Sequence, residues 1–531
     1  MLKFEKQLFH FLVLMALSIL IIPKYYITGD GASHVYNAKV LFDYLLGNER
    51  FFYKVFYQIN RGLDPNWMSH LVIGFFLQIF PSWLADKLFQ ITYVVAFAYG
   101  FRYLIKSIHT ENTFLSFLFF PFLFTLPFQQ GFYNYVFALA LLFWTVGCYI
   151  NHKNDIQSPL QQLKLCGLFL LMSFTHGMPT IYAMMLIGLI WLTDNFKFII
   201  PFDFKKLLNS FSKLLLVLIP TIILMFSFVI KKGFDTVPHT WTASKKFIHF
   251  LQFYTSKSTR NSEQYPAIAV GILLLIFIVL FLISFRQKKS INPMLGYVFL
   301  AFGIYLLYAY VTCPHSIGGA GSIDIRLAYL PPIFLILFFA TKHWNANNKQ
   351  FFIVASILIS STFLVIRFPY VMKANAIGKE MMQAGKFIHD KSIVLNLHFN
   401  DWQPQKSGDS LFQIDGSFIH FTDFLGAEKK KHVIMLMNYE AEIYYFPVNW
   451  RSNKNPRETL KMMLPGNYPP CGDYRLYEKN THQNIDYILF QNWKENYKKQ
   501  SCVDSTLKII ESNFTKIFES ENQYVVVFKR K

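Results

Sequence analysis

Long apolar runs that are almost free of charge fill the first two thirds of this 531-residue chain. The runs are about 14 to 20 residues long, and a helix needs roughly 20 apolar residues to cross the bilayer core. Only 15% of all residues are charged, compared with about 25% in an ordinary soluble domain. The sequence therefore predicts a polytopic α-helical membrane protein. It excludes a soluble enzyme, a collagen, a disordered tail and a disulfide-stabilised mini-protein.

We expect about eleven transmembrane helices, and the first is an uncleaved span because no small-residue cleavage site follows it. The apolar run 68–80 is not counted, because one more span there would reverse the side of every later loop. We interpret 67–80 as a helix that lies at the outer interface and is ended by Pro81. The expected spans are 8–23, 85–106, 113–126, 132–150, 162–175, 177–195, 212–230, 266–285, 294–311, 326–341 and 351–368.

The positions of Lys and Arg predict the orientation of these spans. Basic residues recur in the loops assigned to the inside, such as 286–289, whereas the short outer loops 127–131, 175–177 and 312–325 contain none. The N-terminus is then inside, and long loops at 24–84 and 231–265 are outside. The second of these loops holds a basic, partly aromatic surface, and this surface could serve only to contact anionic lipid headgroups. Its basic residues are Lys231, Lys232, His239, Lys245 and Lys246.

The chain divides into a multi-span domain, residues 1–368, and a soluble α/β domain, residues 369–531, which we expect to be extracytoplasmic. The second domain has helical spacing over 374–389 and four short strand-like runs, at 393–397, 432–437, 485–490 and 524–528. The five cysteines show no CxxC spacing, so no zinc or redox motif is predicted. Cys471 and Cys502 lie in this domain and could pair only in an oxidising compartment, so their pairing stays open.

The segment Gly29–Lys39 opens the first long outer loop and carries the main catalytic candidates. Asp30 follows the first span closely, so we expect it just above the outer membrane surface, and its glycine neighbours leave room for a substrate. A helical pattern starts at Ala32, and His34 lies one turn after Asp30. Asp30 could cap this helix or act as a catalytic base, and one residue can do both.

The order of these features resembles the GT-C superfamily of integral membrane glycosyltransferases. One span is followed by an Asp with a nearby His, and then by a long outer loop that ends in an interfacial helix. The turn 129–134, Gln-Gln-Gly-Phe-Tyr-Asn, is similar to the superfamily's second outer-loop motif. The segments 438–441 and 445–450 are similar to the tails of bacterial members. The resemblance covers the membrane portion, about 370 residues, as an architecture with short motifs.

The resemblance implies an inverting transfer of a sugar from a polyprenyl phosphate or diphosphate carrier to a glycan or protein acceptor. The reaction would take place on the outer side of a bacterial inner membrane. Asp30 would be the general base on the acceptor hydroxyl, with His34 orienting or polarising it. Some members carry a second carboxylate in the 127–134 turn, where this chain has Gln130 and Asn134. Amides hold Mg²⁺ or Mn²⁺ poorly, so we assign no metal ligand and no cofactor, and a divalent cation has weak support.

A phosphate leaving group needs positive charge, and Arg326 is the first candidate to supply it. Arg326 opens a span at its outer end, directly after the flexible stretch 318–322. Its guanidinium can bind two phosphate oxygens at once. The alternative is a structural ion pair with Asp324 or Asp30.

Four further residues complete the predicted substrate-binding set. His176 lies between two apolar runs at the outer face, where it would need a partner such as a carrier phosphate or Asp30, and a structural role is equally open. His315 could lie near Arg326 or be an ordinary surface histidine. Asn134 and Gln130 belong to the second outer-loop turn.

Two other functions stay open at this stage: a transporter or flippase of lipid-linked glycan, and a non-catalytic scaffold whose tail binds outer-surface partners. Transporters often contain paired repeats with charges near mid-membrane, and this sequence shows no two-fold pattern. The net charge of +20 does not indicate a nucleic-acid partner, because no exposed basic run is interleaved with aromatic residues. The motifs of nucleotide hydrolysis and of zinc and serine hydrolases are missing from the sequence.

Overall fold

The computed structural model describes ten stretches of the chain: 4–47, 50–153, 158–199, 203–259, 262–283, 292–399, 411–412, 416–428, 430–460 and 470–531. Eight of the helices in these stretches are long and apolar enough to cross a membrane. They are α5 (Ser82–Ile108), α7 (Tyr133–His152), α9 (Gly177–Asp194), α11 (Phe204–Lys232), α13 (Gln264–Ile283), α14 (Pro293–Thr312), the segment Ile323–Ala340 formed by α15 (Ile323–Leu327) and α16 (Leu330–Ala340), and α17 (Ala346–Met381).

The other three expected spans are also helical but shorter. Helices α1 (Glu5–Ile21) and α8 (Pro159–Thr175) have 17 residues each. The run expected as an α-helix at 113–126 is instead a 3₁₀ helix, η2 (Thr110–Phe122), with Pro121 inside it. A 3₁₀ helix rises about 2 Å per residue, so these 13 residues extend about 26 Å. The polytopic helical fold is therefore confirmed, while the count of eleven spans stays a prediction.

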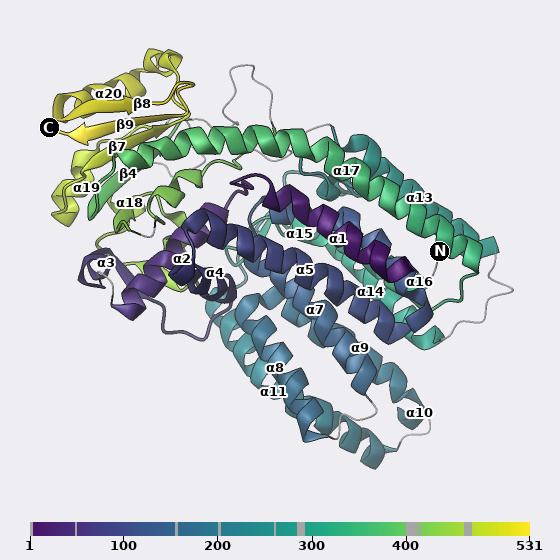
Figure 1. Cartoon of the computed structure of the whole chain (residues 1–531). Helices are drawn as coiled ribbons and strands as arrows, with labels where there is room; N and C mark the ends of the chain where they lie inside the picture. Colours follow the sequence, from purple (N-terminus) through teal and green to yellow (C-terminus); the bar gives the residue numbers. More distant parts are fainter. Residues whose placement is uncertain are drawn as a thin grey trace.

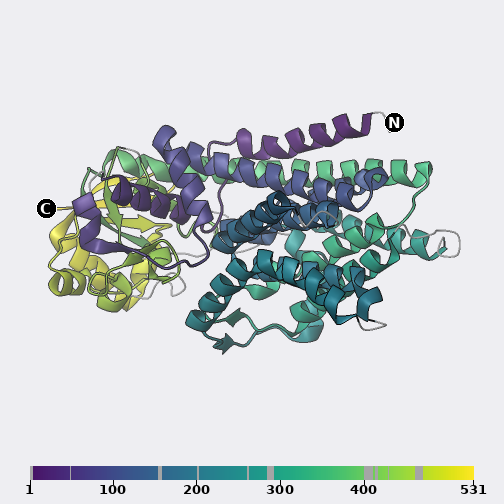
Figure 2. The same ribbon diagram turned by 90° about the horizontal axis from the view of Figure 1, so that it is seen from below.

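The helices of the first long loop lie at the same end of the molecule as the C-terminal domain (Figure 2). They are α2 (Gly31–Leu46), α3 (Arg50–Phe56) and α4 (Met68–Ile79). Helix α4 lies within the range expected to be helical, 67–80, and its position at the outer interface stays a prediction. Strand β1 (Tyr57–Ile59) pairs antiparallel with β6 (Val448–Trp450), so the loop and the C-terminal domain share backbone hydrogen bonds.

The C-terminal domain contains a five-stranded mixed sheet with strand order β5-β4-β7-β9-β8. Strands β5, β4 and β7 are parallel, and β9 and β8 continue the sheet antiparallel. Four strands match the predicted runs, whereas β8 was not predicted because half of its side chains are polar and most of them are not buried. Cys471 and Cys502 form a disulfide. The elements are β4 (Ser392–His398), β5 (Val433–Met435), β7 (Tyr487–Gln491), β8 (Phe514–Glu519), β9 (Val525–Arg530), α18 (Pro456–Leu460), α19 (Tyr474–Thr481) and α20 (Ser501–Asn513).

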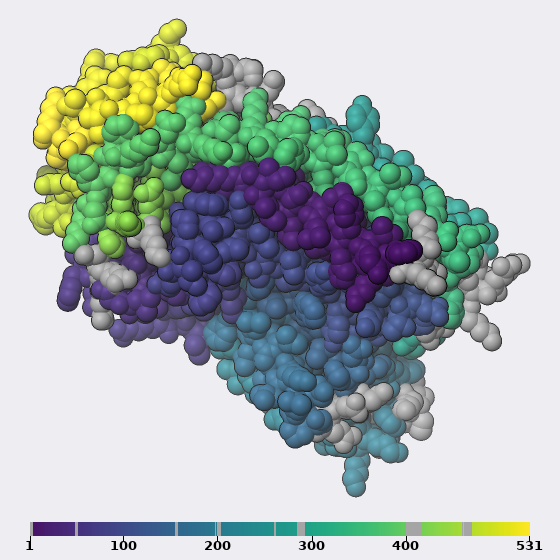
Figure 3. All heavy atoms as spheres, in the orientation of Figure 1, coloured from purple at the N-terminus to yellow at the C-terminus, as the bar shows by residue number. Residues whose placement is uncertain are grey.

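Helix α17 joins the two predicted domains without a break. The sequence predicted a span at 351–368 and a separate helix at 374–389, but one helix of 36 residues covers the first range and the start of the second, and the 3₁₀ helix η4 (Met382–Lys386) follows it. Pro369 lies inside α17, which is curved along its length (Figure 1). Helix α1 lies along α17 in the space-filling view (Figure 3). The expected boundary at 368/369 therefore falls inside a continuous helix.

The two chain ends lie at opposite ends of the molecule (Figure 2), as the predicted topology requires. We expect reporter fusions at residue 290 and at residue 531 to report opposite sides of the membrane. The first of these sites lies outside the described residues. Paired alkaline phosphatase and fluorescent-protein fusions at the two positions would measure the side of the membrane on which each lies. The same side for both fusions would return 68–80 to the list of spans.

Candidate active site

A cavity of about 580 Å³ lies where the outer ends of the helices meet the C-terminal domain. This volume is typical of a small-molecule site. Its walls come from α2, α9, α11 and α15, from the 130–135 turn and from the 439–446 segment. Six of the predicted site residues line it: Asp30, His34, Gln130, Asn134, His176 and Arg326.

Asp30 occupies the N-cap position of α2, as expected, although its side chain makes no capping hydrogen bond. Its backbone N–H donates instead to the carbonyl of Gln130, at 2.9 Å. Gly131 has φ +81°, and a Cβ there would lie 2.5 Å from the backbone nitrogen of Asp30. The two outer-loop motifs are thus packed backbone to backbone, and the Asp30 carboxylate faces the cavity.

The surroundings of Asp30 raise the pKa of its carboxyl to about 6. Burial causes the increase, because a carboxylate loses hydration in the cavity. The positive charge of His34 and a hydrogen bond from Tyr439 partly oppose it. A carboxyl poised near neutral pH suits a general base.

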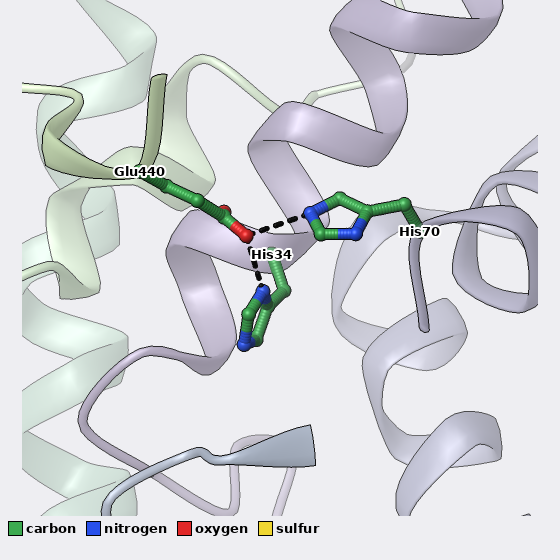
Figure 4. Close-up of side chains that lie close together, drawn as sticks. All are labelled: His34, His70 and Glu440. Atoms are coloured by element: carbon green, nitrogen blue, oxygen red, sulfur yellow. Dashed lines mark hydrogen bonds and ion pairs between the residues drawn. The ribbon is translucent and has the colours of Figure 1, made fainter. Parts of the chain in front are cut away.

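His34, His70 and Glu440 form a buried cluster next to Asp30 (Figure 4). Nδ1 of His34 and Nε2 of His70 each lie 2.7 Å from the same carboxylate oxygen, Oε1 of Glu440. The second ring nitrogen of His34 donates to the carbonyl of Gly131 at 3.0 Å, and the effect of His34 on Asp30 is electrostatic. The expected role of His34 in orienting or polarising Asp30 stays a prediction. Burial disfavours the charged imidazole, but attraction to Glu440 raises the pKa of His34 overall.

A second group, His239, His315 and Asp324, joins the two later outer loops. Nδ1 of His239 accepts the backbone N–H of Trp241 at 2.8 Å, so its ring proton is on Nε2. That nitrogen donates to Asp324 at 3.0 Å and has no lone pair for a metal. Asp324 therefore pairs with His239 and not with Arg326, and His315 is exposed and lies outside the cavity lining.

Part of the cavity wall is cationic. Nη1 of Arg326 lies 3.5 Å from Nε2 of His176, and the guanidinium lies over the rings of Phe132 and Tyr135. Lys232 from the end of α11 also lines the cavity. Neither Arg326 nor Lys232 has a carboxylate partner among the residues that the structure describes. Burial, followed by these two charges, lowers the pKa of His176.

The two predicted amide residues hold the backbone around the cavity. Asn134 accepts the N–H of Ser69 at 2.9 Å and donates to the carbonyl of Asn66, which fixes the start of α4. Gln130 lines the cavity and holds Asp30 through its own carbonyl.

Three site residues escaped sequence analysis. Lys232 was assigned to the basic surface of the second long loop and not to the site. Glu440 lies in the segment 438–441, which was noted only because it is similar to the tails of bacterial GT-C members. His70 could have been found, because it is a histidine within the apolar helix α4, where an ionisable group is costly without a partner.

The fold and the cavity together define a multi-pass membrane protein with a cavity lined by the Asp30 carboxylate and by a cationic group of side chains. No protein-family model matches the sequence, and no curated protein matches it. Two crystal structures of ArnT from Cupriavidus metallidurans, one bound to undecaprenyl phosphate and one in the apo state, are similar to the whole chain. Each has a TM-score of 0.52 and 8% sequence identity, and covers 98% of this chain and 97% of its own. ArnT is a GT-C glycosyltransferase, so the GT-C resemblance is confirmed for the fold.

Proposed function

We propose that this protein is a membrane glycosyltransferase. It transfers a sugar from a polyprenyl phosphate or diphosphate carrier to a hydroxyl group of a glycan or protein acceptor, on the outer face of the cell membrane. The observation that carries the proposal is the convergence of two N–H donors in the cationic part of the cavity that Asp30 also lines.

The two donors belong to His176 and Arg326. Nδ1 of His176 accepts the backbone N–H of Met178 at 3.2 Å, so the ring proton is on Nε2. Nε2 and Nη1 of Arg326 are therefore both donors although they lie only 3.5 Å apart. Two donors that face each other need an acceptor between them, and Nε of Arg326 is a third buried donor without a partner among the described residues. A phosphate oxygen supplies such an acceptor, and Lys232 adds charge to hold it.

The apolar part of the cavity wall suits a donor that comes from the bilayer. Ile181, Phe228 and Val229 lie on α9 and α11, and Ile323 begins α15. A lipid-borne phosphate could thus reach Arg326 along helices that cross the membrane. The fold neighbour ArnT was crystallised with undecaprenyl phosphate, which supports a carrier of this type.

The reaction then needs few groups. The acceptor oxygen forms a bond to the anomeric carbon while the bond from that carbon to the phosphate oxygen breaks. The acceptor proton passes to Asp30, and the electron pair leaves with the phosphate, held by Arg326, His176 and Lys232. Attack from the side opposite the leaving group inverts the anomeric centre.

Two observations support an outer location for this chemistry. The disulfide Cys471–Cys502 belongs to the domain that carries Glu440, and disulfides persist in oxidising compartments such as the bacterial periplasm. The distribution of Lys and Arg places the same domain outside.

Replacing Arg326 by Lys should weaken carrier binding at least tenfold, because a point charge cannot reproduce the guanidinium's several donors. Hydrogen bonds to charged groups are worth about 1.5–3 kcal/mol, which corresponds to about a tenfold change or more. Binding of undecaprenyl phosphate in detergent can be measured by native mass spectrometry. Arg457→Lys is the matched control, since Arg457 is exposed and contacts only Glu442 among the described residues. Equal affinity in both variants would contradict the phosphate site, and carrier binding by wild type without any sugar transfer would favour a transporter.

A further inference from the structure

We propose that His34, His70 and Glu440 bind one divalent transition-metal ion of the Zn²⁺ type. The three donor atoms lie within 4.8 Å of one another and come from three separate segments: α2, α4 and the turn η6 (Tyr439–Glu442). The side chains are almost fully buried. A buried set of two imidazoles and one carboxylate is a frequent zinc-binding combination.

The hydrogen bonds of the two histidines show which ring nitrogens are free to bind an ion. Nε2 of His34 donates to the carbonyl of Gly131 at 3.0 Å, and Nδ1 of His70 donates to the carbonyl of Asn66 at 3.1 Å. Metal binding requires neutral imidazoles, and in that form the other nitrogen of each ring carries a lone pair that faces Oε1 of Glu440. A metal-binding histidine usually donates its other ring N–H to a group such as a backbone carbonyl, which fixes the orientation of the ring.

The lone pairs of the three donor atoms, which lie within 4.8 Å of one another, repel unless a positive charge lies among them. Ring protons directed at Oε1 of Glu440 can supply this charge, and a divalent ion that displaces them can supply it in their place. One metal ion satisfies all three atoms at once.

The outer partners and dimensions of the cluster also fit an ion. Asn37 donates to the second carboxylate oxygen of Glu440 at 2.8 Å, which orients the first. Bonds of about 2.0–2.1 Å in tetrahedral geometry separate neighbouring ligand atoms by about 3.3 Å, so the present contacts must widen by about half an ångström. Phe446 packs against both imidazole rings and limits access of water. Imidazole ligands favour Zn²⁺ over Mg²⁺.

The ion would be a positioning element and not a catalytic one. It would tie the first outer loop and the interfacial helix to the C-terminal domain, one helical turn from Asp30. The inference concerns metal binding and does not rest on the proposed sugar transfer, so either can fail without the other.

The test is the metal content of the full-length protein, purified in detergent through a tag that binds no metal. After removal of bound metal with a chelator and exposure to Zn²⁺, we expect about one equivalent of Zn²⁺ per chain by mass spectrometry. His70→Gln should retain less than about a tenth of it. His315→Gln is the matched control, because it removes a histidine from the other cluster, and it should keep the full equivalent.

Co²⁺ gives a second readout that does not depend on a variant folding. Wild type without metal should take up Co²⁺ saturably, with the visible absorption bands of a low-coordinate site, and both Co²⁺ and Zn²⁺ should raise its thermal midpoint. A wild-type protein that binds no Zn²⁺ above background and shows no Co²⁺ spectrum would overturn the proposal. Loss of the equivalent in His315→Gln but not in His70→Gln would overturn the assignment to this cluster.

Discussion

Asp30→Asn is expected to fold like the wild-type protein and to lose sugar transfer by about 10²–10⁴-fold. The amide has nearly the same size as the carboxylate but cannot take up the acceptor proton. The side chain makes no capping hydrogen bond, and its backbone bond to Gln130 is unaffected by the change. The loss should therefore appear in the rate constant of transfer with saturating carrier, measured by single-turnover kinetics, and not in carrier binding.

The control for this experiment is Asp235→Asn, which changes an exposed aspartate of the second outer loop. It should leave both transfer and carrier binding as in wild type. If Asp30→Asn kept wild-type transfer with its true donor and acceptor, Asp30 would not be the base. If it lost carrier binding as well, its role would be in shaping the cavity.

Glu263→Gln is expected to destabilise the protein by about 3–5 kcal/mol, the usual effect of removing one partner of a buried ion pair. Oε1 of Glu263 accepts from Nε of Arg367 at 2.6 Å, and the other oxygen accepts the backbone N–H groups of Ser258 and Thr259. The exposed fractions of the two charged side chains are 0% and 2%. Without the carboxylate, the guanidinium on α17 stays buried with no opposing charge. The free energy of unfolding can be measured by denaturant titration in mixed micelles.

Two further variants make this result specific. Asp504→Asn breaks an ion pair with Lys508 that is exposed on α20, and it should cause no measurable change. Adding Arg367→Leu to Glu263→Gln should recover most of the lost stability, because no buried charge then remains and the amide carbonyl at position 263 can still accept the backbone N–H groups of Ser258 and Thr259. Equal stability of Glu263→Gln and Asp504→Asn would show that Glu263 and Arg367 are not paired.

The sequence predicted the membrane fold and one half of the site well, and the reasons are local. Apolar runs identify helices whatever their neighbours are, and Asp30, His176 and Arg326 were all placed by their positions at the outer ends of such runs. The outcome for α17 shows the limit of this reasoning. The sequence predicted a span at 351–368 and a second helix at 374–389, whereas α17 continues from Ala346 to Met381 and packs against η2, α13 and α1.

The other half of the site depends on contacts between distant segments. His34 and Glu440 are 406 residues apart in the sequence, and no local pattern links them. The neighbours of an ionisable group also decide its role: Asp324 pairs with His239, which leaves Arg326 available to the cavity. Pairing of this kind is a property of the folded chain and could not be read from residue types and spacing.

Helix α17 has a further consequence for how the chain can vary in length. It extends about 54 Å at 1.5 Å per residue, from the far end of the membrane helices to the C-terminal sheet. One residue inserted between Arg367 and Met381 would turn everything beyond it by about 100° about the helix axis. Glu440 would then swing away from His34 and His70. The number of residues in this part of α17 is therefore constrained, because it sets the rotation of the C-terminal domain about the helix axis. The identity of its outward-facing side chains is not constrained in this way.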